Sequence, residues 1–207
     1  GFLEPGTVIV NPREGNKRPR VAVDNENDNI YNAQGFPSKG LEYFLKNAEQ
    51  YRYVGGKSPL FVSVCGIPSE DENLDKALEN AYLELGYLID GVNPYADGFV
   101  WNPFSPNTST LKALRTTEQF KKNANLIKIK AKDKLKLVKM GPYDENNKDE
   151  WLSLVGAWLD SGGDGIVAVN TYMVPKEKIP SKEWGYQSAG RSGRFLQDYR
   201  QRAIKDT

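Results

Sequence analysis

Five short apolar runs spaced along the chain constrain the fold more than any other feature. Each run has four or five residues, a length typical of strands buried in a parallel sheet and too short for a buried helix. The runs occupy residues 7–10, 60–64, 98–101, 135–139 and 165–169. The last four recur at intervals of about 30 to 40 residues, a repeat typical of alternating strands and helices in an α/β fold.

Amphipathic segments between these runs are predicted to form helices. The clearest begins at Ser69, with Glu72 three residues later as a capping box. Its apolar face carries Leu74, Ala77, Leu78, Ala81 and Leu85. A second helix is marked by Leu111, Leu114 and Phe120, a third by Trp151, Val155, Trp158 and Leu159, and a last one, after Ser192, by Phe195, Leu196 and Tyr199. Each set falls on one helical face, as a helix packed on a sheet requires.

The alternation predicts a parallel sheet, either as a (β/α) barrel or as a doubly wound sheet, and periodicity does not choose between these two architectures. Residues 11–36 interrupt the pattern with prolines, glycines and polar residues. We expect a long ordered loop there, with a hairpin around residues 21–23. The 207 residues suit one domain, and a hydrophobic content of 39% is ample for its core.

Composition excludes several classes of function. Lys and Arg number 28 and Asp and Glu 27, so the net charge of +1 gives no basic field for a nucleic acid. The chain has no histidine and a single cysteine, Cys65, which removes the usual general base, an intrachain disulfide and a multi-cysteine metal cluster. No apolar run approaches the roughly 18 to 20 residues that a bilayer requires, and the first residues lack the basic segment of a signal peptide. We therefore expect a soluble chain without a metal.

Polar residues follow the predicted strands at the end where parallel α/β folds bind ligands. After the third run, Asn102, Ser105 and Asn107 stand between two prolines that restrict the backbone. Their amides and hydroxyl could hold a flat polar ligand, although an ordinary Pro/Asn turn explains the same residues.

Two further strand ends carry candidate groups. Lys139 ends the fourth run, where it either stabilises an anion or lies on the surface. Asn170 and Thr171 follow the fifth run, and a buried amide there either caps a turn or binds a ligand. Small residues at 188–194 precede the last predicted helix, as an anion cradle or as a capped loop.

Taken in order, four segments resemble the dihydroorotate dehydrogenase family. They are GFLEPGTV at residues 1–8, PREGN at 12–16, NAQGF at 32–36 and NPFSPNT at 102–108. The last is similar to the active-site loop of the serine-using class 2 type. The resemblance extends over essentially the whole chain and implies a (β/α)8 TIM barrel with FMN as cofactor. This chain would supply roughly the second to sixth strands of the barrel, as a single partial domain at residues 1–207.

The resemblance also implies roles for individual residues. Ser105 matches the base that removes a proton from C5 of dihydroorotate while a hydride passes from C6 to FMN, which produces orotate. The implied substrate contacts are Asn32, Asn102, Asn107, Asn170 and Thr171. The implied flavin contacts are Lys139, Ser63, Asn102, Ser192 and Gly193. A serine is a weak base at neutral pH, so this chemistry requires the surrounding polar groups.

The chain departs from the family pattern at several positions, which leaves alternatives open. Phe104 replaces a small polar residue, Arg191 and Phe195 alter the flavin loop, and residues 63–66 are closer to the cysteine-using class 1 type. Val23 replaces an arginine that faces the quinone tunnel, which leaves the electron acceptor open. A catalytically inactive segment that binds a ligand or partner, or an FMN barrel for a related pyrimidine, would also suit these departures.

The resemblance leaves the assembly and the cellular location open. It implies a cytoplasmic or peripherally membrane-associated protein and permits a homo-oligomer. A complete barrel of this kind takes about 250 residues. We therefore expect further residues of the same chain, or another chain, to complete the barrel, with a natural remnant as a third alternative.

Overall fold

A four-stranded parallel sheet forms the centre of the computed structural model, which describes residues 1–207. Its strands are β3 (Phe61–Val64), β4 (Gly98–Trp101), β5 (Leu135–Lys139) and β6 (Gly165–Val167), in the order β3-β4-β5-β6. The N-terminal segment adds two isolated parallel bridges to the free edge of β3, at Leu3 and Val8. All five apolar runs therefore lie in one parallel arrangement, although the first forms only a bridge at Val8 and β6 ends two residues early.

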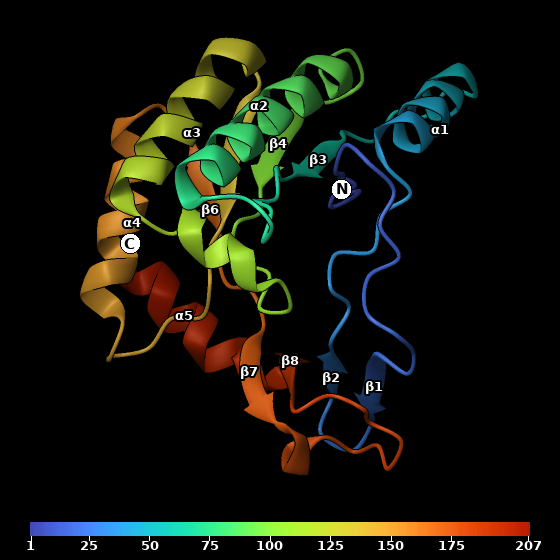
Figure 1. Ribbon diagram of the computed structural model, residues 1–207, viewed down its shortest axis with the longest axis vertical. Coiled ribbons are helices and arrows are strands. Elements are labelled where there is room, and N and C mark those ends of the chain that lie inside the picture. The colour runs from blue at the N-terminus through green and yellow to red at the C-terminus, as the bar shows by residue number, and fades with distance from the viewer.

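Helices cover one side of this sheet (Figure 1). They are α1 (Leu41–Tyr53), α2 (Leu74–Val92), α3 (Thr117–Ala131) and α4 (Lys148–Asp160). Each helix packs against the next one along the chain. This succession on a single side is the arrangement of a barrel, because a doubly wound sheet carries helices on both faces.

Aromatic side chains fill the core between the sheet and its helices. Trp101 on β4 stacks on Trp158 of α4 with ring centroids 5.8 Å apart, and Phe120 of α3 meets Trp101 edge-on at 5.0 Å. All three side chains are buried. The predicted inward faces of the second and third helices are thus confirmed at Phe120 and Trp158.

A second sheet lies beside the parallel one (Figure 1). It is antiparallel, in the order β1-β2-β8-β7. Its strands are β1 (Val21–Asp24), β2 (Asn29–Asn32), β7 (Tyr172–Pro175) and β8 (Ser188–Gly193). A small core of its own includes Tyr31, Val174 and Trp184. The hairpin expected around residues 21–23 is confirmed, whereas β7 and β8 were not predicted.

Several helix boundaries differ from the prediction for local reasons. Asn73, not Ser69, caps α2, because its side chain accepts the Lys76 N–H at 2.9 Å while the Ser69 hydroxyl accepts the Asp71 N–H. Leu74 consequently begins the helix with its side chain exposed.

The other predicted helices are also shifted or shortened. Leu111 and Leu114 lie in a separate 3₁₀ helix, Ser109–Leu114. The final helix α5 (Gln197–Asp206) begins after a 3₁₀ turn, Arg194–Leu196, so Phe195 and Leu196 precede it and are half-buried. Leu159 of α4 is largely exposed. Helix α1 was not predicted, because only Leu41 and Ala48 are fully buried along its length.

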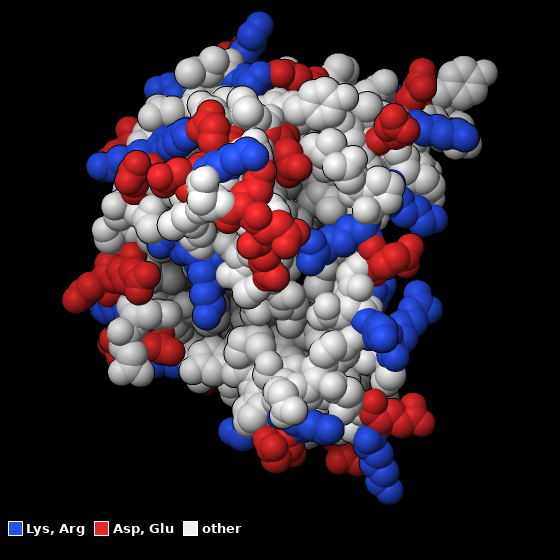
Figure 2. All heavy atoms as spheres, in the orientation of Figure 1, with Lys and Arg blue, Asp and Glu red and all other residues white.

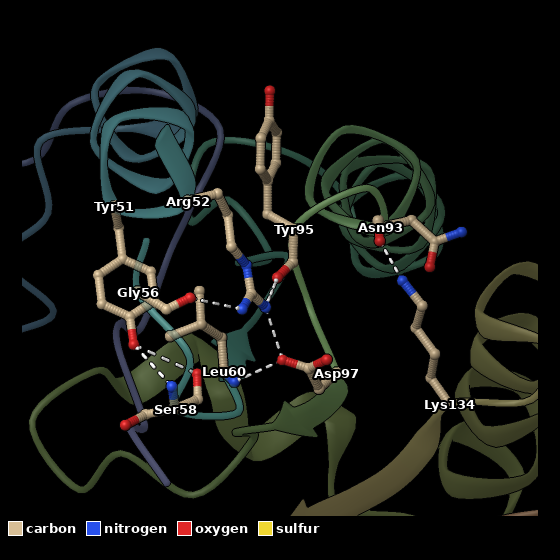
Figure 3. Close-up of polar contacts among 9 residues, drawn as sticks. All are labelled: Tyr51, Arg52, Gly56, Ser58, Leu60, Asn93, Tyr95, Asp97 and Lys134. Carbon is tan, nitrogen blue, oxygen red and sulfur yellow. Dashed lines mark hydrogen bonds and ion pairs between the residues drawn. The ribbon is translucent and has the colours of Figure 1, made fainter. Parts of the chain in front are cut away.

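An ion pair ties the C-terminal end of α1 to the starts of two strands (Figure 3). Arg52 contacts the Asp97 carboxylate at 2.6 Å and donates to the Tyr95 carbonyl at 2.9 Å, and the Leu60 N–H donates to the same carboxylate at 2.8 Å. Burial raises the pKa of Asp97, but the hydrogen bonds from Leu60 and Arg52 outweigh it, so the net pKa lies below its ordinary value. This cluster fixes the end of the sheet opposite the ends that carry the predicted site residues.

Surface charge differs between the helical layer and the antiparallel sheet. Figure 2 shows charges of both signs interspersed over the helices, whereas the middle of the face over the antiparallel sheet is largely uncharged. No helix combines the length and the apolar character needed to cross a bilayer.

Candidate active site

A polar pocket of about 190 Å³ lies at the C-terminal ends of the parallel strands, under the antiparallel sheet. Five segments of the chain contribute to it. It is lined by Gly6, Thr7, Asn32, Gln34, Phe36, Pro37, Asn102, Ser105, Pro106, Asn107, Lys139, Asn170 and Thr171. Ser105, Lys139 and all the predicted substrate contacts are among these residues. Segments up to 165 positions apart in the sequence, from Gly6 to Thr171, therefore meet at one cavity.

Four asparagine side chains are held by hydrogen bonds around this pocket. Asn107 donates to the Asn32 side-chain oxygen at 3.1 Å, and Asn32 donates to the Gly190 carbonyl at 3.2 Å. Asn170 donates to the Phe104 carbonyl at 3.2 Å and to the Asn102 side-chain oxygen at 3.4 Å. Each amide thus has at least one fixed partner, which orients its remaining donors and acceptors for a ligand.

Thr7 connects two of the predicted residues and was missed by the sequence analysis. Its hydroxyl lies 2.9 Å from the Ser63 hydroxyl and accepts a hydrogen bond from the Asn102 amide, also at 2.9 Å. Ser63 is buried and does not line the pocket, so the structure places it behind Thr7. A direct contact of Ser63 with a cofactor stays a prediction, and Thr7 is the residue of this pair that lines the cavity.

The loop that carries Ser105 is held from behind by Arg115, which the sequence analysis also missed. The guanidinium donates to the Pro103 carbonyl at 3.1 Å and to the Ser105 carbonyl at 3.2 Å. Its carbon Cζ lies 4.9 Å from the centre of the Phe104 ring. Burial lowers the pKa of Arg115, with Cys65 and Glu150 acting in the opposite direction. Arg115 is therefore a positioning residue for the serine.

Phe104 points away from the pocket. Its ring packs edge-on against Phe120, 6.1 Å between centroids, and does not line the cavity. Gly141 leaves the room for this ring, because a Cβ there would lie 2.5 Å from it. The large side chain beside Ser105 consequently fills the core and leaves the pocket open.

Lys139 lines the pocket, and two glycines nearby lie in close contact with other parts of the chain. The Lys139 ammonium lies 3.7 Å from the Glu4 carboxylate, and both side chains are partly exposed. Gly6 has φ of +125°, and a Cβ there would lie 2.5 Å from the Ser63 carbonyl oxygen. A Cβ on Gly190 would lie 2.2 Å from the Thr171 hydroxyl, which is buried without a hydrogen-bond partner. Thr171 lines the pocket, and its hydroxyl has no hydrogen-bond partner within the protein.

Ser192 and Gly193 do not join the pocket. Both lie in β8, where the Ser192 hydroxyl donates to the Ile30 carbonyl at 3.3 Å. Residues 188–193 pair with β2 and β7 instead of forming a loop before a helix, so neither the anion-cradle nor the capped-loop interpretation is confirmed. A contact of either residue with a flavin stays a prediction.

The fold is that of a barrel-type α/β protein, with a polar pocket at the C-terminal ends of its strands. A family model described as dihydroorotate dehydrogenase matches residues 1–206. The chain belongs to the dihydroorotate dehydrogenase family.

Individual relatives and solved structures agree with this assignment. A dihydroorotate dehydrogenase (quinone) from Marinomonas sp. (strain MWYL1) is 29% identical over 99% of this chain and 58% of the relative. One from Hamiltonella defensa is 31% identical over 95% of this chain and 57% of the relative. The crystal structure of DHODH from Eimeria tenella in complex with ferulenol has a TM-score of 0.81 at 22% identity, and covers 100% of this chain and 59% of that one. The fold is thus part of a (β/α)8 barrel, and the chain spans less than two thirds of the relatives it matches.

Proposed function

We propose that this protein oxidises dihydroorotate to orotate, with Ser105 as the catalytic base and FMN as the cofactor. The observation that carries the proposal is the convergence of Asn32, Asn102, Asn107 and Asn170 with Ser105 on one small pocket. Side-chain amides at fixed positions match the alternating carbonyl and N–H groups of a pyrimidine ring. Family membership supports the same substrate.

The residues of the pocket fit a flavin beside this substrate. Thr7 and Thr171 line the cavity, the Thr171 hydroxyl has no protein partner, and Gly6 brings the backbone to the cavity without a side chain. Lys139 supplies a positive charge for an electron-rich ring. When bound there, FMN would accept a hydride from C6 of the substrate.

The chain's own groups would hold the substrate and move one proton. The asparagine amides would orient the ring so that its C5–H faces the Ser105 hydroxyl, which has no hydrogen bond to another protein group. The serine oxygen would take the C5 proton and pass its own hydroxyl proton to solvent water. Arg115 would keep the serine in place through the Pro103 and Ser105 carbonyls. Positioning matters because a serine hydroxyl is a weak base on its own.

The test is the Ser105→Ala variant, with Ser109→Ala as its matched control. Ser109 lies outside the pocket, and its hydroxyl donates to Glu70 at 2.7 Å. Ser105→Ala should lower turnover of dihydroorotate by about 10² to 10⁴, the usual contribution of a general base, and leave orotate binding nearly unchanged. Ser109→Ala should keep full turnover. A colourless wild-type protein that also fails to bind FMN would contradict the proposal, and so would an active Ser105→Ala variant.

Two comparisons would define the reaction further. Dihydrouracil in place of dihydroorotate distinguishes a related pyrimidine substrate, since it lacks the carboxylate. We propose a quinone as the electron acceptor, which is supported by the names of the relatives. A short-chain quinone should then reoxidise the reduced protein faster than a soluble dye does.

A further inference from the structure

Arg191 has an unusual environment on the antiparallel sheet. It lies on β8 between Tyr31 of β2 and Tyr172 of β7, to which it is paired in register. The centre of the guanidinium is 4.1 Å from the Phe195 ring centroid and 5.6 Å from that of Tyr31. No carboxylate lies within ion-pair distance of Arg191, none of its side-chain N–H groups donates to a protein acceptor, and its Nε atom is buried.

A guanidinium in this position lacks the partners that it normally has. It carries five N–H donors and a permanent charge, and removing such a group from water is unfavourable unless an acceptor replaces the water. The aromatic faces of Phe195 and Tyr31 stabilise the charge but accept no conventional hydrogen bond from it. An anion would supply both the missing hydrogen-bond acceptor and the missing opposite charge.

Arg191 opens into a cavity of about 450 Å³, which we call the arginine pocket. The cavity is lined by Asn27, Asn29, Arg191, Arg194, Phe195, Asp198, Tyr199 and Arg202. Three guanidinium groups thus line the cavity with one carboxylate, that of Asp198, and Arg194 also lies 4.0 Å from the Asp28 carboxylate outside it. The arginine pocket shares no residue with the candidate active site, and it is formed by the β1–β2 turn, the end of β8 and helix α5.

Hydrogen bonds of Asn29 and the packing of aromatic rings hold the walls of the arginine pocket. Asn29 is 2% exposed; it accepts the Phe195 N–H at 3.1 Å and donates to the Asn27 carbonyl at 2.8 Å. The Tyr199 ring lies 5.3 Å from the Phe195 ring, and the guanidinium of Arg202 lies 5.2 Å from the Tyr199 ring centre. Arg202 has no carboxylate partner within ion-pair distance. Two arginines are therefore held over aromatic rings with their donors unused.

We infer that the arginine pocket binds a small phosphate monoester with an aromatic body. Planar guanidinium groups match the oxygens of a phosphate dianion and form charge-assisted hydrogen bonds with it. The rings of Phe195 and Tyr199 provide apolar surface for an aromatic group attached to the phosphate. This inference does not depend on the proposed dehydrogenase activity, because its residues lie outside that site.

Phenyl phosphate is a suitable probe, and isothermal titration calorimetry on the intact protein gives the measurement. We expect saturable binding to the wild type, weaker binding of inorganic phosphate, and no comparable binding of phenol. Arg191→Gln and Arg202→Gln should each weaken phenyl phosphate about tenfold or more, as expected for loss of a charge-assisted hydrogen bond.

Arg200→Gln is the matched control, because Arg200 is exposed on the same helix and lines no part of the arginine pocket. It should leave the affinity within about twofold, the range of a surface charge change. Arg202 is itself exposed, so Arg202→Gln tests the pocket even if Arg191→Gln fails to fold. Absence of saturable binding to the wild type, or an equal loss in Arg200→Gln, would overturn the inference.

Discussion

Replacing Arg115 should distinguish its effect on the position of the Ser105 loop from any effect on the binding of substrate and FMN. The Arg115→Gln variant loses hydrogen bonds to the Pro103 and Ser105 carbonyls, at 3.1 and 3.2 Å, and the contact with the Phe104 ring. Hydrogen bonds to a charged group contribute about 1.5 to 3 kcal/mol each. The freed carbonyls partly regain water, so we expect a net loss of about 2 to 4 kcal/mol in the free energy of unfolding.

The catalytic effect of this change should exceed its effect on binding. A displacement of the serine by about 1 Å is enough to lower turnover by about 10². We therefore expect kcat for dihydroorotate to fall by roughly that factor, with little change in orotate affinity or flavin content. Arg115→Lys should recover only part of kcat, because an ammonium keeps the charge over Phe104 but lacks the planar fork that reaches both carbonyls.

Steady-state kinetics and urea denaturation of the same preparations provide the assay. Lys112→Gln serves as the control, since Lys112 is exposed in the preceding 3₁₀ helix. Our reasoning would be refuted if Arg115→Gln kept wild-type kcat, or if its loss of activity equalled the fraction of unfolded protein. In either case the guanidinium would stabilise the fold without positioning Ser105.

Three further changes test other parts of the structure. Gly6→Ala should abolish flavin retention, measured by visible absorbance, because the new Cβ would lie 2.5 Å from the Ser63 carbonyl oxygen at a φ of +125°. Trp158→Ala should cost about 3 to 5 kcal/mol in urea denaturation, since the ring is fully buried. Asp97→Asn should make the free energy of unfolding fall less steeply as the pH is lowered in the acid range. The folded pKa of Asp97 lies below the unfolded value near 3.8, so its contribution is present above that pH and is lost as the pH falls towards the folded pKa.

The parallel sheet could be predicted from sequence because its strands are short runs in which apolar residues predominate, and β4 is buried throughout. The runs at Gly98–Trp101 and Leu135–Lys139 coincide with β4 and β5 to the residue. Helix α1 and strand β8 could not be predicted in the same way. Helix α1 buries little of its surface, and the segment Ser188–Gly193 consists of small and charged residues that become a strand only between β2 and β7. Tertiary pairing, not local propensity, determines that segment.

The prediction of the candidate site from sequence was limited in a similar way. Resemblance to a family identified the asparagines and Ser105, and the structure brings them together. Thr7 and Arg115 carried no comparable signal. Thr7 lies in the first apolar run and in the GFLEPGTV segment, neither of which gave it a role in the site. Arg115 acts through backbone carbonyls, which any sequence supplies. Residues that support others through the main chain therefore become visible only in three dimensions.

Phe104 shows why the direction of a side chain matters more than its identity. A phenylalanine beside the proposed catalytic serine was one of the departures that left an inactive segment open as an alternative. In the structure, however, the ring packs on Phe120, its carbonyl accepts from Asn170, and Gly141 provides the space. Neighbouring residues of this loop thus face opposite sides, so a change in volume at Phe104 is accommodated by the core. The substitution therefore gives no physical support to an inactive barrel, and the activity of the Ser105 hydroxyl has to be judged from the pocket that Ser105 itself lines.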